Sequence, residues 1–272
     1  MTTSWARYSI IGGLALATLL ITVDKSHAQI GDLTIFAGTA YPIYDERLTL
    51  RPSTPSLPGA VISVTGSPAI KADGGLVFGA ALAFEAGLIG IEGRLDSTAV
   101  GFDLTGARYE IRPEGQVSVP IGSVTIGDGR LDANRLQLLS LNLRLRTPGP
   151  VSVVASGGFS LLPNIEITGS APLAAEIIGL PLVPQVRPTV RLTAAPGEDN
   201  HRYGVNGGLG LRIGGSRVAA IGEVRVFYFR EYELRFDVDN APDIVGDLLE
   251  GLDPIRFTPI IVNAQAGLVL RF

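Results

Sequence analysis

The sequence lacks several residue types and segments, and each absence excludes a class of protein. It has no cysteine, so disulfide bonds and thiolate metal sites are excluded. It has no basic block of the kind that follows a nucleic-acid backbone, so we expect no nucleic-acid partner. After residue 28 there is no uninterrupted run of 18 apolar residues, which argues against a membrane-spanning helix. Nothing in the pattern indicates a metal or another cofactor.

The first 28 residues have the three parts of a secretory signal peptide. Arg7 gives a positive start, Ile10–Val23 is an apolar run, and residues 26–28 (SHA) form a small-x-small site. The run is shorter than the roughly 20 apolar residues that a spanning helix needs. We therefore expect residues 1–28 to be removed on export. The mature chain, residues 29–272, would carry 20 basic and 25 acidic residues.

Glycine and apolar residues are abundant, with 34 glycines and a mean hydropathy of +0.33. A chain this apolar without a helical span fits two kinds of protein. One is a soluble all-β domain with an apolar core. The other is a membrane β-barrel, in which each strand turns one face to lipid and the other to the interior. The period-2 pattern of the strands has to distinguish them.

The last segment, 258–272, alternates most clearly. One face has no polar member, and the other is mostly polar or small. A strand of about ten residues with this pattern suits a tilted membrane span. The apolar face consists of Val262, Ala264, Ala266, Leu268, Leu270 and Phe272.

Seven further segments alternate in the same way. Residues 203–230 form a hairpin around the turn sequence Gly214-Gly215-Ser216. The predicted strands are 32–42, 74–86, 88–97, 135–147, 186–196, 202–213, 217–230 and 258–272. An even, antiparallel count lets the sheet close and leaves no edge unpaired in lipid. The sequence therefore predicts an all-β fold, a closed antiparallel up-and-down transmembrane β-barrel of eight strands.

The connections predict an orientation but leave one segment open. The joints at 86–87 and 214–216 are short and would be periplasmic, whereas those at 43–73, 98–134 and 231–257 are long and would be extracellular. Residues 148–185 fit poorly, either as a long periplasmic insertion or as an extra hairpin. A ten-stranded barrel that uses 150–159 and 161–169 is the alternative. Strand-like stretches in 99–126 could extend a surface hairpin.

The run YGVNGGLGLRI, the turn GGS, the run RVAAIGEVRVFYF and the ending AGLVLRF resemble the last three strands of small outer-membrane barrels. These are the OmpA-transmembrane, OmpX and OmpW-like barrel domains. The resemblance implies a bacterial outer-membrane location, contact with outer-membrane lipids, and a terminal aromatic that the barrel assembly machinery recognises. Phe272 matches that aromatic, with Leu270, Leu268 and Ala266 on its face, although the family often has Tyr where this chain has Leu270.

Alternation also predicts a set of charged side chains inside the barrel. Buried charges must pair, and an eight-stranded barrel is just wide enough for its side chains to fill it. The set therefore predicts a salt-bridged plug that holds the barrel closed, or alternatively a narrow arginine-rich lumen that passes small anions. The predicted members are Glu85, Glu92, Arg94, Asp96, Arg144, Arg146, Arg187, Arg191, Arg212, Glu223, Arg225 and Arg271.

Motifs that could carry chemistry are weak. His201 is the one histidine of the mature chain, and a lipid-A deacylase would need a nucleophile beside it, yet no serine follows two residues on. The acidic run FDVDNAPD, residues 236–243, lacks the glycine and glutamate that a calcium loop requires. Gly208 and Gly210 are better explained as interior glycines that make room in a narrow barrel.

We therefore expect a non-enzymatic barrel that acts as a scaffold for surface loops, which could hold an extracellular ligand. A small passive channel for anionic solutes is the first alternative. A lipid-modifying barrel enzyme is the second, and a soluble all-β sandwich is the structural rival to all three.

Overall fold

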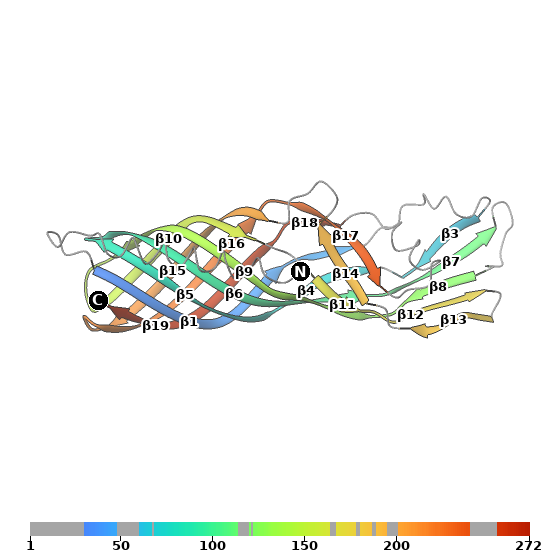
Figure 1. The fold of residues 1–272 in the computed structure, drawn as a ribbon, viewed down its shortest axis with the longest axis horizontal. Coiled ribbons are helices and arrows are strands. Elements are labelled where there is room, and N and C mark those ends of the chain that lie inside the picture. The colour runs from blue at the N-terminus through green and yellow to red at the C-terminus, as the bar shows by residue number, and fades with distance from the viewer. Residues whose placement is uncertain are drawn as a thin grey trace, which may run out of the picture.

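The computed structural model describes residues 30–47, 60–66, 68–113, 120, 122–163, 167–177, 180–186, 189–194, 201–239 and 255–272. Regular structure in these ranges consists of β-strands. They form an elongated molecule with three parts along its length (Figure 1). A barrel lies at the left of the picture, a tier of further strands follows it, and a small sheet lies at the far right. The direction from the barrel toward the small sheet is called up. The predicted signal peptide, residues 1–28, lies outside the described residues.

Eight strands close into an antiparallel barrel, which confirms the predicted fold class and strand count. Each strand pairs with the next one along the chain, and the first pairs with the last through the β1–β19 register, which includes Leu33 opposite Leu270. The barrel strands are β1 (Ile30–Ile43), β5 (Gly75–Ala86), β6 (Ile89–Thr105), β9 (Gly129–Arg146), β10 (Val151–Leu162), β15 (Arg202–Gly214), β16 (Val218–Phe229) and β19 (Ile260–Arg271).

The outer face of this barrel is apolar. On β9, Leu139, Leu141, Leu143 and Leu145 are all exposed, while the residues between them point inward and are buried or nearly so. The other barrel strands show the same alternation, with exposed Ile, Val, Leu and Phe side chains on the outside. Lipid is the solvent in which such a surface is stable, so the barrel is a transmembrane one.

Exposed tyrosines mark one border of the apolar belt. Tyr41, Tyr203 and Tyr228 lie near the ends of β1, β15 and β16, on the side of the long connections, and each is at least half exposed. Aromatic girdles of this kind sit at membrane interfaces, because the ring is apolar and the hydroxyl can reach water. The opposite end carries the first and last described residues, Ile30 and Phe272, and the short turns 87–88, 147–150 and 215–217.

Above the tyrosines the same eight chain passages continue as a second tier. Its strand order is β2-β4-β6-β9-β11-β14-β17-β18, in which β6 and β9 run through from the barrel. The added strands are β2 (Asp45–Arg47), β4 (Ala69–Asp73), β11 (Ile167–Ser170), β14 (Thr189–Ala194), β17 (Tyr232–Asp239) and β18 (Ile255–Phe257). Among the described residues β2 and β18 are its two ends, so this tier is an open sheet.

A third, five-stranded antiparallel sheet lies at the far end of the molecule (Figure 1). Tyr109 is buried within it, and this burial raises the pKa of its hydroxyl. The strand order is β13 (Leu180–Val186), β12 (Leu173–Ile177), β8 (Gly122–Ile126), β7 (Ala107–Pro113) and β3 (Ala60–Thr65). The expectation that 99–126 extends a surface hairpin is thus confirmed by β7 and β8.

One predicted barrel strand is wrong. The fifth strand is β10 at Val151–Leu162, not the segment 186–196. The latter does contain a strand, β14, but its apolar residues Val190 and Leu192 are the buried ones, as expected where the outside is water. Alternation alone does not say which face points inward. Residues 148–185 therefore supply the barrel strand β10 and, beyond it, β11, β12 and the start of β13. These last three strands belong to the upper parts of the molecule, at the end opposite the short turns.

No helix in the described ranges is long and apolar enough to cross a membrane.

Candidate functional site

The barrel interior holds the charged cluster that makes it the candidate functional site. In the ring of eight strands, β6 and β16 stand on opposite walls. Arg94 on β6 reaches Glu223 on β16 at 3.4 Å, and Arg225 on β16 reaches Glu92 on β6 at 3.0 Å. Two ion pairs therefore cross the full width of the lumen.

Arg225 is the centre of this cluster and is fully buried. Its Nε donates to Glu223 at 2.7 Å, and its Nη2 donates to Glu92 at 3.0 Å and to Ser156 at 2.5 Å. Its Nη1 donates to the side-chain carbonyl of Asn206. A guanidinium has five N–H donors in a fixed plane, so one arginine ties together β6, β10, β15 and β16.

A second buried arginine, Arg94, is held in a complementary way. Its Nε and Nη2 donate side-on to both carboxylate oxygens of Asp96, at 2.8 and 2.9 Å. Its guanidinium carbon lies 3.9 Å from the centre of the Phe36 ring, a cation–π contact. The bidentate pair and the ring fix the side chain, which leaves its remaining Nη1 aimed at Glu223.

Neutral polar side chains fill the wall beside these pairs. Asn142 donates to Glu92 at 3.0 Å, and Asn206 donates to Asn142 at 2.8 Å and to Ser160 at 2.9 Å. Ser140 and Ser160 share a further hydrogen bond at 2.8 Å. Buried polar groups are costly unless they are satisfied. This network connects β9, β10 and β15 at the level of the crossing ion pairs.

A second charged layer lies nearer the short turns. Arg271 donates to Asp32 at 2.8 Å, and Arg146 lies 2.9 Å from Glu85. Arg144 is 1% exposed and has Asp32, Glu85 and Glu92 within 3.8 Å. The two carboxylates Asp32 and Glu85 are thus shared by three arginines from β9 and β19.

Glycines on the inner face make room for the cluster, as the sequence suggested for Gly208. A Cβ atom on Gly208 would lie 2.5 Å from Oε1 of Glu223 and 3.1 Å from the guanidinium carbon of Arg225. Any larger residue there would displace the Glu223–Arg225 pair. The glycine therefore sets the space in which the pair forms.

Above the charged layers the interior becomes apolar. Phe227, Phe229, Leu138 and Leu162 are buried, and the packing continues into the second tier. There Phe257 meets Tyr44 and Phe102 edge-on, at ring distances of 4.6 and 5.8 Å. Polar plug and apolar core thus follow one another along the axis.

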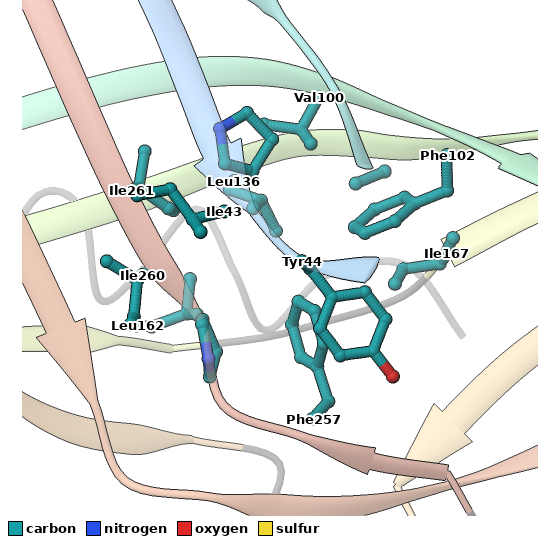
Figure 2. A pocket seen from close by; sticks show the side chains of 13 residues that line it. Ile43, Tyr44, Val100, Phe102, Leu136, Leu162, Ile167, Phe257, Ile260 and Ile261 are labelled. Carbon is teal, nitrogen blue, oxygen red and sulfur yellow. The ribbon is translucent and has the colours of Figure 1, made fainter. Parts of the chain in front are cut away.

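A small pocket lies within this apolar core, where β1 and β19 give way to β2 and β18 (Figure 2). It is lined by Phe102 of β6, Ile167 of β11, Phe257 of β18 and Tyr44, which links β1 to β2. It offers about 10 Å³ of space to a water-sized molecule, which is at most room for one water. Because its lining is almost wholly apolar, it is a packing gap rather than a binding site.

The structure brings most of the predicted interior charges together. Arg191 instead lies on β14, outside the closed barrel, so its assignment to the barrel interior is wrong, because the strand that carries it belongs to the tier. Arg187 lies outside the described residues. The predicted charges that do lie on the inner face of the barrel are Glu85, Glu92, Arg94, Asp96, Arg144, Arg146, Arg212, Glu223, Arg225 and Arg271.

Sequence reasoning missed several members of the cluster. Asp32 is fully buried and pairs with Arg271, and it stands at the first position of the predicted strand 32–42. Asn142 and Asn206 stood on the polar faces of predicted strands, and a search for amides as well as charges would have found them. Ser156 and Ser160 belong to the strand that was not assigned to the barrel.

The weaker motifs show no sign of chemistry. His201 is exposed and meets Tyr203 edge-on, at 5.5 Å between ring centres. Asp237 and Asp239 lie on β17, whereas Asp243 is outside the described residues. Within the described ranges no group of His, Asp and Glu could hold a metal ion. Phe272, Leu268 and Leu270 are exposed on the outside of β19 or just after it, which fits the predicted assembly signal but does not test it.

Comparison with known proteins finds solved structures that are similar in part. No protein family and no curated protein matches the chain. The outer membrane protein OprG from Pseudomonas aeruginosa is 13% identical, with a TM-score of 0.39, over 92% of this chain and 99% of that one. The outer membrane protease OmpT from Escherichia coli is 10% identical, with a TM-score of 0.43, over 93% and 99%. At these scores neither likeness carries an argument about function.

Proposed function

We propose that this protein is a non-conducting barrel of the bacterial outer membrane that anchors a tall strand extension for contacts at the cell surface. The observation that carries the proposal is the pair of ion bridges across the lumen, Arg94–Glu223 and Arg225–Glu92. A barrel whose opposite walls are tied together has no free path along its axis. The apolar packing of Phe227, Phe229 and Leu162 fills the next level.

The outer-membrane location is supported by two independent features. A closed barrel with an apolar belt and a tyrosine girdle is one of the two structures that can span a bilayer, because it leaves no backbone group unpaired in lipid. The expected signal peptide would direct the chain out of the cytoplasm. The extension above the girdle would then stand in water, away from the membrane.

The anion channel is the weaker of the two barrel functions. A ring of one charge sign is what gives a pore its selectivity. Here the arginines of the central level face Glu92, Asp96 and Glu223, so positive charge is matched by nearby negative charge. A lipid-modifying enzyme has less support, because His201 is exposed and no nucleophile lies against it in the described contacts.

Planar-bilayer recording of the refolded protein tests the proposal. The wild type should show no steady ion-permeable openings. The double variant Arg225→Ala, Glu223→Ala removes one member of each crossing ion pair, and it should show openings because the cluster is the barrier. Arg217→Ala, an exposed residue of a short turn, is the matched control and should behave as the wild type does. Steady openings of the wild type would overturn the closed-barrel proposal.

A further inference from the structure

Arg212 differs from Arg144, a buried arginine that also lacks hydrogen bonds but has three carboxylates within 3.8 Å, because no described carboxylate lies within ion-pair distance of Arg212. It is 4% exposed, and its Nε and Nη2 have no hydrogen-bond partner within the described part of the chain. In Arg94 and Arg271 the same edge, Nε with Nη2, is taken by a carboxylate, that of Asp96 and that of Asp32. The edge that grips a carboxylate in two neighbours is therefore unmatched in Arg212.

The acids nearby are already engaged. The charged groups that act on Arg212 are Asp32, Arg271, Arg146 and Glu85, two of each sign. Asp32 and Glu85 are bonded to Arg271 and Arg146 and lie within 3.8 Å of Arg144. This end of the lumen thus holds more guanidinium groups than carboxylates. Buried charge without a counter-charge is costly, so a further anion would stabilise it.

A second unpartnered donor stands beside Arg212. Ser152 on β10 is its direct cross-strand partner, and both side chains point inward. Ser152 is 2% exposed, and its hydroxyl has no hydrogen-bond partner among the described residues. Arg146, at the end of β9 just before the β9–β10 turn, also has an unpartnered Nε. The surrounding wall is small and apolar, with Val154, Ala219, Ile221 and Val269 packed together.

We infer that the short-turn end of the lumen binds a small oxyanion of the phosphate class, held side-on by Arg212 and bonded by the Ser152 hydroxyl. A guanidinium edge matches two oxygens of such an anion, and a hydroxyl suits a third. The anion comes from solution or from a phospholipid headgroup. The site uses side chains at this end of the barrel alone. Anion binding there therefore does not depend on whether the lumen as a whole conducts ions.

Thermal unfolding of the refolded full chain in alkyl maltoside micelles tests the site. Sodium phosphate is compared with sodium chloride at equal ionic strength. A ligand that binds only the folded state raises the unfolding midpoint. At a phosphate concentration ten times the dissociation constant we expect a rise of about 3–5 °C for the wild type. A second arm in chloride adds phosphatidylglycerol to the micelles, and a rise there identifies a lipid headgroup as a ligand.

Variants assign the effect to Arg212. In Arg212→Gln the phosphate-dependent rise should vanish, while the midpoint in chloride should equal or exceed that of the wild type, because a buried unpaired charge has been removed. Arg217→Gln, in the turn 215–217 at the same end, should keep the full rise. Ser152→Ala retains the charge and should weaken phosphate binding by about tenfold, which serves as the test if Arg212→Gln does not fold.

Three results would overturn the inference. The first is a wild type that unfolds at the same temperature in chloride, phosphate and phosphatidylglycerol. The second is an Arg212→Gln variant that keeps the phosphate-dependent rise. The third is an Arg212→Gln variant that folds but unfolds well below the wild type in chloride, since that would assign Arg212 a structural partner.

Discussion

The barrel and the tier above it are made of the same chain passages but have opposite polarity. Strand β6 shows this without a break in its alternation, since even-numbered residues point inward along most of its length. Its inner face changes from Glu92, Arg94 and Asp96 to Val100, Phe102 and Leu104. Its outer face changes from Ile91 and Leu95 to Asp103 and Thr105.

This difference shows that the medium outside decides what the inside must be. Where the outside is water, burial of apolar side chains drives packing, and the tier has an apolar core. Where the outside is lipid, apolar side chains gain little by turning inward, and the interior is free to be polar if its groups are paired. The barrel is therefore held together by hydrogen bonds of the sheet and by ion pairs, and the tier by its core.

The largest loss of stability is expected when Arg225, the central cation of the barrel interior, is removed. Arg225→Leu leaves Glu92 and Glu223 buried with fewer counter-charges, and breaking a buried pair in this way costs about 3–5 kcal/mol. Urea unfolding of the protein in micelles or vesicles measures the loss. An equally stable Arg225→Leu variant would mean that the cluster does not hold the walls together.

The matching change in the tier is Phe102→Ala. Phe102 is 2% exposed and contacts Phe257, and truncation of a buried Phe costs about 3–5 kcal/mol. We expect the loss to fall on the tier while the barrel stays folded, because the two parts are stabilised differently. Limited proteolysis should then cut within tier strands such as β4, β11 and β14 and leave the barrel strands protected. Cleavage throughout the barrel would show that the two parts fold as one unit.

The outer faces are compared by placing the same residue on both parts of β6. Leu95→Arg puts a charge into the lipid belt and should cost up to about 2–4 kcal/mol, depending on depth. Thr105→Arg puts it on the polar outer face of the tier and should leave stability unchanged. Unfolding free energies of the two variants in vesicles measure the difference. Equal costs at the two positions would place both in the same medium.

The smallest effect is expected for an ion-pair ladder on the outside of the tier. Arg130 lies 3.1 Å from Asp73 and 3.4 Å from Asp132, but all three side chains are about half exposed or more. Solvent screens such pairs, and most contribute little. The unfolding free energy of Arg130→Gln should therefore equal that of the wild type, in contrast to that of Arg225→Leu. A large loss would show that exposed pairs also hold the extension together.

The barrel was largely predictable because lipid requires every second residue of a spanning strand to be apolar. Seven of its strands were found from alternation, including the hairpin at 203–230 and the final strand, and glycines such as Gly208 could be read as space for neighbours. Alternation also identified the crossing charges Arg94, Glu223, Arg225 and Glu92. It did so because each has an exposed isoleucine, leucine or valine next to it on its strand, which puts the charge itself on the opposite, inner face.

The rest was not predictable from the pattern alone. Strand β10 has serine and glycine on its inner face, which weakens the contrast between faces, so VSVVASGGFSLL did not stand out. Segment 186–196 alternates as well as a barrel strand does, yet its apolar face is buried in the tier. An alternating pattern shows that the two faces of a strand differ, but it does not show which face meets lipid, water or the interior. For the strand β14 the pairing with β11 and β17 decides this.

Cysteine labelling along β6 tests the change of medium most directly, because the native chain has no cysteine. Leu95→Cys and Thr105→Cys are each reconstituted in lipid vesicles, with a charged maleimide present on both sides of the membrane. The contrast predicts rapid labelling at position 105 and protection at position 95 until the vesicles and protein are dissolved in denaturant. Equal labelling at the two positions in intact vesicles would contradict the change of medium, since both outer faces would then lie in water.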